Sequence, residues 1–122
     1  MFPQTVECAL NAVVQLAGAP SGTASIQDLA SRTKLPASSL ALSLQPLIRA
    51  ELIYARRGVG VTLAKPAAMI TLLDVIDAIK PLKSLPDRQV PVAARLQQTM
   101  DAALDHFRSQ LASATLADLV SR

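Results

Sequence analysis

The sequence predicts a mainly α fold that carries one small β-hairpin. Hydrophobic residues make up 51% of the 122 residues but aromatic residues only 2%, so the core must consist of Ala, Leu, Val and Ile, which favours packed helices over a β-sandwich. Apolar residues recur at helical spacing along most of the chain. Between residues 52 and 63 they alternate instead, as in two half-buried strands. A helix that leads directly into a hairpin indicates a winged helix-turn-helix domain, here followed by a long C-terminal helix.

The length allows one domain, or one domain with an extension. We expect the winged helix-turn-helix domain at residues 1–80, a linker at 81–91, and a dimerisation helix with a short C-terminal turn at 92–122. No apolar run reaches the roughly 18 to 20 residues that a membrane span needs, and the N-terminus lacks the features of a secretory signal. One cysteine cannot form an internal disulfide. Together with the lack of a membrane span and of a secretory signal, this predicts a cytoplasmic protein with no membrane partner.

The first helix is expected from Pro3 to Ala17, and Gly18 and Pro20 end it. Spacings of three and four residues give it one apolar stripe, which consists of Val6, Leu10, Val13 and Ala17.

Two further helices are expected in close succession. Ser25 suits the N-cap of a short helix that ends near Thr33, and Asp28 completes a near capping box. The next helix covers residues 36–50, with Pro36 in its first turn, where the missing N–H costs no hydrogen bond. This order is typical of a helix-turn-helix, in which the first helix supports and the second reads DNA.

Pro46 lies inside the apolar period of the reading helix, whose stripe is Leu40, Leu44 and Leu47. An interior proline removes one hydrogen bond and clashes one turn back, at a cost of ~3 kcal/mol. We therefore expect a kink, or a break at which Pro46 opens a second short helix. The first two turns remain available for DNA in both cases.

The outward residues of the reading helix are not basic. Serines bond to phosphate or to several base edges and carry little sequence code, whereas Gln45 either pairs with adenine or is an ordinary exposed glutamine. The expected outward residues are Ser38, Ser39, Leu42 and Ser43, with Gln45 further along.

The hairpin tip, Arg56-Arg57-Gly58-Val59-Gly60, combines two arginines with two glycines that permit a tight turn. From residue 32 to 65 the chain has six basic residues and one acid, six minus one or +5, against +3 for the whole chain. Such a concentration suits a phosphate backbone, although an ordinary solvated surface is the alternative. We expect double-stranded DNA as the partner. The candidate contact residues are Ser25, Ser38, Ser39, Leu42, Ser43, Gln45, Arg56, Arg57 and Lys65.

Another helix follows the hairpin. Thr71 suits its N-cap, Asp74 takes the capping-box position, and Pro81 ends it. We expect most of this helix to be buried, because its sequence is strongly apolar: Leu72, Leu73, Val75, Ile76 and Ile79.

The helical period returns at Val92 and lasts about five turns, with no obvious partner left in the N-terminal domain. We expect it to pair with a second copy of the chain, or alternatively to fold back over its own domain. Thr115 with Asp118 caps a last short turn. The residues expected at the dimer interface are Leu96, Met100, Ala103, Leu104, Phe107 and Leu111.

A set of short segments along nearly the whole chain has a recognisable order and spacing. The segments are, in order, Glu7-Cys8-Ala9-Leu10 with Leu16-Ala17, Ile26-Gln27-Asp28-Leu29-Ala30, Leu40, Leu44, Leu47, Ala50, Leu52 and Ile53, Arg57-Gly58, Leu63-Ala64 with Pro66, Ile70-Thr71-Leu72-Leu73-Asp74-Val75-Ile76, and Thr115-Leu116-Ala117-Asp118-Leu119. Together they resemble the Rrf family of winged-helix transcriptional regulators, of the IscR, NsrR and CymR type. The resemblance implies a homodimeric repressor or activator, dimerised through the long C-terminal helix, with the wing arginine Arg57 near DNA.

Two departures from the family pattern bear on function. Redox-sensing or iron-sensing members carry three cysteines between the buried helix and the dimer helix, but residues 80–95 contain none. We therefore expect no iron–sulfur cluster and no metal. The wing is also about two residues shorter than is usual in the family, which favours phosphate contact over insertion into the minor groove.

Other chemistry is sparse. We interpret Cys8 as a small residue packed at a helix edge, on the face of Asn11 and Gln15, with a redox switch as the alternative. His106 has no ligand-type neighbour in the sequence. No catalytic set or phosphate loop is recognisable, so we expect no enzyme. The sequence leaves two functions open, a DNA-binding regulator with an unknown small-molecule or protein effector, and a winged-helix protein-interaction module.

Overall fold

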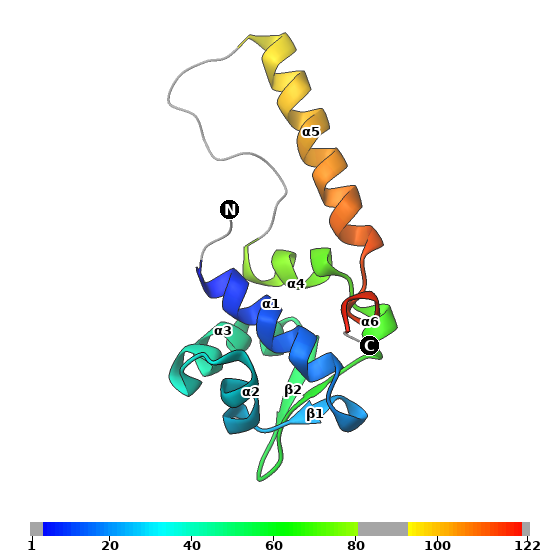
Figure 1. The fold of residues 1–122 in the computed structure, drawn as a ribbon. Coiled ribbons are helices and arrows are strands. Elements are labelled where there is room, and N and C mark those ends of the chain that lie inside the picture. The colour runs from blue at the N-terminus through cyan, green and yellow to red at the C-terminus, as the bar shows by residue number, and fades with distance from the viewer. Residues whose placement is uncertain (1–3, 81–92, 121–122) are drawn as a thin grey trace.

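The computed structural model describes residues 4–80 and 93–120. Helices dominate it, and a small antiparallel sheet lies beside them (Figure 1). This confirms the predicted mainly α fold with a hairpin wing, whereas the predicted linker at 81–91 falls outside the described residues. The elements are α1 (Gln4–Ala17), β1 (Thr23–Ala24), α2 (Ile26–Thr33), α3 (Ala37–Arg49), β2 (Ile53–Arg56), β3 (Gly60–Leu63), α4 (Leu72–Ile79), α5 (Ala94–Ser113) and α6 (Leu116–Leu119), with 3-10 turns at Pro20–Gly22 and Ala67–Met69.

Helix α1 has a broader buried face than the predicted stripe. Leu10 and Ala17, which the stripe included, are only half-buried. Cys8 is 5% exposed, although the pattern grouped it with exposed Asn11 and Gln15. The reason is that α2, α3, α4 and α6 all pack against α1, so more than one side of the helix is covered. The buried residues of α1 are Val6, Cys8, Ala9, Ala12, Val13 and Leu16.

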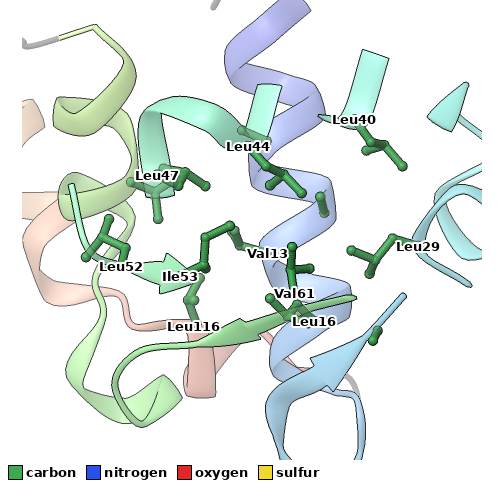
Figure 2. Packing of buried hydrophobic residues seen from close by; sticks show 14 of the residues in the cluster. Val13, Leu16, Leu29, Leu40, Leu44, Leu47, Leu52, Ile53, Val61 and Leu116 are labelled. Carbon is green, nitrogen blue, oxygen red and sulfur yellow. The ribbon is translucent and has the colours of Figure 1, made fainter. Parts of the chain in front are cut away.

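The core lies where α1, α3 and the sheet meet. Figure 2 shows Leu44 and Leu47 pointing from α3 toward the side of α1 that carries Val13. Ile53 and Val61 of the sheet close the same cluster (Figure 2). Full burial of each such side chain contributes about 1.5–3 kcal/mol. This cluster fixes one face of α3 and leaves its opposite face to solvent.

The sheet has three strands in the order β1-β3-β2, not the two of the predicted hairpin. Residues 23 and 24 fall in a predicted loop, but they pair with β3, Thr23 opposite Thr62. The predicted alternation is also wrong, because Thr62 is buried next to Val61 and Tyr54 is 46% exposed. As the central strand, β3 is covered on both sides. Its buried Thr62 hydroxyl is satisfied by the Thr23 hydroxyl at 2.6 Å and donates to the Gly22 carbonyl at 3.1 Å.

Helix α3 runs through Pro46 as one element, so of the two expected outcomes the break at that proline is wrong and the kink stays a prediction. Pro36, predicted in the first turn, is the N-cap residue. Pro46 lies in the last turns, and the Ala50 N–H still bonds to its carbonyl at 3.0 Å. The carbonyl that loses its partner belongs to Leu42, whose side chain is 67% exposed, so water can reach that side of the helix.

Helices α4 and α6 begin side by side in matching capping boxes, both of which the sequence predicts. Thr71 and Asp74 exchange their two bonds at 3.0 Å. Thr115 and Asp118 do the same at 3.0 and 3.2 Å. The two caps are joined by an antiparallel bridge between Thr71 and Thr115, which consists of two backbone bonds, Leu72 N–H to Ala114 C=O at 2.9 Å and Leu116 N–H to Ile70 C=O at 2.8 Å. This pairing returns the chain to the core, where Leu116 is fully buried.

Helix α5 extends away from the rest of the molecule (Figure 1). All 20 of its residues are described and none is buried, and Leu96 is 49% exposed. The C-terminal part of α5 is fixed to α4 by a bidentate ion pair of Arg108 with Asp77 at 3.2 and 3.3 Å. No helix within 4–80 and 93–120, α5 included, is long and apolar enough to cross a membrane.

Helix α4 is less buried than its sequence predicts. Val75 and Ile76 are buried, but Leu72, Leu73 and Ile79 are half-buried. Helix α4 packs on α1, α3 and α5, and among the described residues these three helices cover its apolar side chains only in part.

Candidate nucleic-acid interface

The turn between α2 and α3 orients the reading helix. Ser25 caps α2 as predicted, its hydroxyl oxygen accepting from the Asp28 N–H at 3.0 Å. Lys34 ends α2 with φ 61°, in the left-handed region, and its N–H bonds to the Ala30 carbonyl at 2.8 Å. Leu29 and Leu40, both fully buried, bring the two helices together on the inside of the turn.

The solvent face of α3 is a row of side chains at spacings of three and four residues. Ser38, Leu42 and Gln45 are exposed as predicted, and Ser39 is half-buried. Ser43 was predicted to face outward but is 4% exposed. It follows Leu40 by three residues and adjoins Leu44, so the broad contact of α3 with α1 includes it. The face therefore comprises Ser38, Ala41, Leu42, Gln45 and Arg49.

Two members of this face, Ala41 and Arg49, were not among the predicted contact residues. Ala41 lies three residues after Ser38, and Arg49 lies four residues after Gln45, so the helical period already contained the signal.

The wing is the turn between β2 and β3. The Val59 N–H bonds to the Arg56 carbonyl at 3.0 Å, and Gly58 adopts φ 77°, which glycine tolerates without a steric cost. Gly60 has φ 126°, and a Cβ there would overlap the Ala24 carbonyl oxygen and lie 2.6 Å from the Ser25 Cα. The missing side chain thus lets the base of the wing contact the start of α2. The turn holds Arg56 and Arg57 in solvent.

Residues 32–65 are rich in exposed positive charge, but not all of it lies beside the α3 face. Arg32 lines a hollow with Gly18 and Leu119, and Lys65 lines one with Ala17 and Ser21. All six basic residues between positions 32 and 65 are exposed, and the single acid in that stretch, Glu51, is exposed as well. Ser25, Gln27 and Arg56 line a hollow between α2 and the wing. The wing tip points away from α5 (Figure 1). The basic residues are Arg32, Lys34, Arg49, Arg56, Arg57 and Lys65.

These placements give the surface a simple chemistry. The exposed face of α3 carries no charge before Arg49, and further exposed cations lie on α2 and on the wing. Exposed cations neutralise phosphates, and an exposed helix face of hydroxyl, amide and apolar groups can meet base edges.

The chain is similar to known proteins in sequence and in fold. A family model, Rrf2, described as iron-dependent transcriptional regulator, matches residues 2–122. The solved structure of CymR (YrzC), the global cysteine regulator of B. subtilis, is 22% identical, covers 100% of this chain and 97% of its own, and has a TM-score of 0.86. T. potens IscR is 21% identical over 98% of this chain and 85% of its own, with a TM-score of 0.80. Staphylococcus aureus CymR is 24% identical over 98% of both chains, with a TM-score of 0.80.

Proposed function

The chain belongs to the Rrf2 family of transcriptional regulators, as its resemblance predicted, and from that premise we propose that it is a homodimeric repressor that binds double-stranded DNA and carries no iron–sulfur cluster. Its relatives are regulators of transcription and not enzymes, and the proposed role is likewise binding. The observation that carries the proposal is an exposed face on α3 together with a wing that contacts the start of α2 and exposes two arginines.

The charge supports a nucleic acid as the partner. Six exposed cations against one exposed acid give residues 32–65 a net charge of +5, six minus one. Cations that neutralise phosphates release counterions, so binding should be strong at low salt and should weaken as salt rises. In this proposal α3 enters the major groove and the wing contacts the backbone.

The exposed stripe of α5 supports a homodimer. The helix carries an apolar row of which Met100, Leu104 and Phe107 are only half-buried, and Leu96 is 49% exposed. A second copy offers the same row, and a two-fold axis would bury both rows at once. Such a dimer would also present two reading helices to a two-fold DNA site. The proposed interface residues are the ones expected from the sequence, Leu96, Met100, Ala103, Leu104, Phe107 and Leu111.

The residues of the chain do not fit an iron–sulfur cluster. Such clusters are held by several cysteine thiolates. The whole chain has one cysteine, Cys8, and it is 5% exposed on the inner side of α1. Within the described residues no group of three or more His, Cys, Asp or Glu side chains is arranged to hold a metal ion. We propose that the signal is an effector of another kind, a small molecule or a protein.

A protein-interaction module is the second candidate. It is favoured by one observation, that the single cation of α3 is Arg49 at the far end of the helix. A reading helix without basic residues along its first turns makes few phosphate contacts of its own. If the chain binds DNA, the wing and α2 must therefore supply these contacts.

Fluorescence anisotropy of the full-length chain tests the proposal. DNA from upstream of its own gene should bind more tightly than scrambled DNA, and the affinity should fall steeply with salt. Replacing Arg56 and Arg57 together by alanine should weaken binding. It should also reduce the slope of log affinity against log salt by about one for each phosphate that the arginines neutralise.

The double variant Lys80→Ala with Arg95→Ala is the matched control. It removes the same charge from exposed positions at the end of α4 and on α5, so the salt slope should not change. Weak and equal binding to both DNAs would overturn the proposal in favour of the interaction module. An unchanged slope in the wing variant would contradict the placement of the wing on DNA.

A further inference from the structure

The solvent face of α3 has an unusual composition for a surface that reads bases. Leu42 is 67% exposed, the highest exposure among the large hydrophobic side chains described. Gln45 follows it by three residues and is exposed on the same face. The other members of the face before Arg49 are Ser38 and Ala41, so three turns of helix present no charge.

Each base presents a different set of hydrogen-bonding and apolar groups in the major groove. Guanine is read chiefly by arginine or lysine, which donate two hydrogen bonds to its O6 and N7. Adenine is read by asparagine or glutamine, and thymine offers a C5-methyl group to apolar side chains. The uncharged turns of α3 lack the guanine reader but hold the other two, Gln45 and Leu42.

We infer that this chain reads A·T base pairs through α3, with Leu42 packed on a thymine methyl group and Gln45 bonded to adenine. The inference rests on the proposed DNA-binding function and specifies its substrate. Residues three apart on a helix have Cβ atoms about 5–6 Å apart, close enough to meet the same or neighbouring base pairs. Arg49 and the wing arginines then hold the backbone and carry no sequence code.

The exposure of Leu42 gives the inference its physical basis. Removing this apolar side chain, which is two-thirds exposed, from water stabilises the complex that covers it. A thymine methyl group is the apolar atom group that the floor of the major groove provides. A protein partner could also cover Leu42, and the experiment distinguishes that case.

The test begins with selection of binding sites from random duplex DNA by the full-length chain. Each thymine of the selected site is then replaced by deoxyuridine, which lacks only the methyl group. At the thymine beneath Leu42, loss of the methyl group should weaken binding roughly fourfold. The Leu42→Ala variant should bind the thymine site more weakly by a similar factor and should no longer respond to deoxyuridine.

Met69→Ala is the matched control, because Met69 is 66% exposed and lies on the turn before α4, away from α3. It should keep both the affinity and the response to deoxyuridine. Gln45→Ala should relax the preference for adenine at one position of the site, roughly fivefold or more.

The outcomes separate the inference from the proposed function. Selection without any enriched sequence would overturn both. An enriched site with guanine at the positions under α3, or one at which no deoxyuridine substitution weakens binding, would overturn the inference alone. A response to deoxyuridine that survives in Leu42→Ala would also overturn it, because another side chain would then hold the methyl group.

Discussion

Helices α3 and α5 carry the same kind of apolar stripe but lie in different surroundings. Along α3, Leu40, Leu44 and Leu47 are at most 1% exposed. The corresponding stripe of α5 contains no buried residue over 20 described positions, and Leu96 at its outer end is 49% exposed. Helix α3 packs on α1, α2 and α4, whereas the main partner of α5 is α4.

This difference shows what an apolar period does and does not predict. It identifies the face of a helix that leaves water, but it does not say which surface covers that face. For α3 the cover comes from the same chain. For α5 the described residues cover the stripe only in part, which is why we propose a second copy of the chain.

The largest effect should come from opening the covered stripe. Leu44→Ala leaves a cavity between α3 and α1 and should lower the free energy of unfolding by about 2–5 kcal/mol. Leu42→Ala, two residues earlier on the solvent face, should change it by less than about 0.5 kcal/mol. Urea denaturation of both variants measures the difference. Equal losses would mean that α3 does not have one closed and one open face.

Charges placed on the exposed stripe of α5 should separate the subunits of the proposed dimer. Met100→Glu with Leu104→Glu buries two carboxylates at the proposed interface and should weaken dimerisation at least 100-fold, about 2.7 kcal/mol. Gln98→Glu with Ser109→Glu adds the same charge to the opposite face of α5 and should leave the dimer intact. Sedimentation equilibrium compares the two. If both variants keep the mass of the parent, the stripe is not the interface.

Gly60 and Gly58 of the wing also differ in their surroundings, because other backbone atoms crowd Gly60 and none crowd Gly58. At Gly60 a methyl group would overlap the backbone of β1, and φ 126° is itself a conformation that costs other residues about 1–3 kcal/mol. At Gly58 nothing lies within 4 Å, so Gly58→Ala should cost only the strain of φ 77°, about 1 kcal/mol. Thermal unfolding should rank Gly60→Ala as the less stable variant. The reverse order would contradict the contact between the wing and α2.

The smallest effect concerns the cap of α6, where the chain returns to the core after α5. Hydrogen bonds from the backbone and side chain of Thr115 lower the pKa of Asp118 below its usual range. The folded state therefore favours the carboxylate, so its contribution to stability is complete above about pH 4 and is lost as pH falls through the lowered pKa. Asp118→Ala should be less stable than the parent at pH 6, and the difference should shrink as pH falls below about 4. Asp105→Ala, on the exposed face of α5, controls for the change in net charge.

Local signals predicted much of this structure. Both capping boxes follow from a threonine and an aspartate three residues apart, because the motif closes on itself without distant residues. The wing turn follows from its two glycines in the same way. The order of the helices and the α3 core stripe follow from the spacing of leucines.

Features that depend on residues far apart in the chain were not predicted from the sequence. Strand β1 is two residues long, too short for any period, and exists because β3 lies beside it. Ser43 is polar and lies at the edge of the stripe, and its burial depends on how closely α1 approaches. Leu116 looks like part of a terminal turn, but the pairing of Thr71 with Thr115 carries it into the core. Among the candidate DNA contacts, the helical period could exclude inner positions but could not locate the edge of the buried face.

The central claim is that two copies of this chain join through α5 and place two α3 helices on one DNA duplex. Analytical ultracentrifugation of the full-length chain, alone and with a duplex that carries a selected site, tests it most directly. We expect a free species of twice the 12.9 kDa of one chain and a complex with two chains per duplex. A monomer in solution that binds the duplex as a single copy would contradict the account.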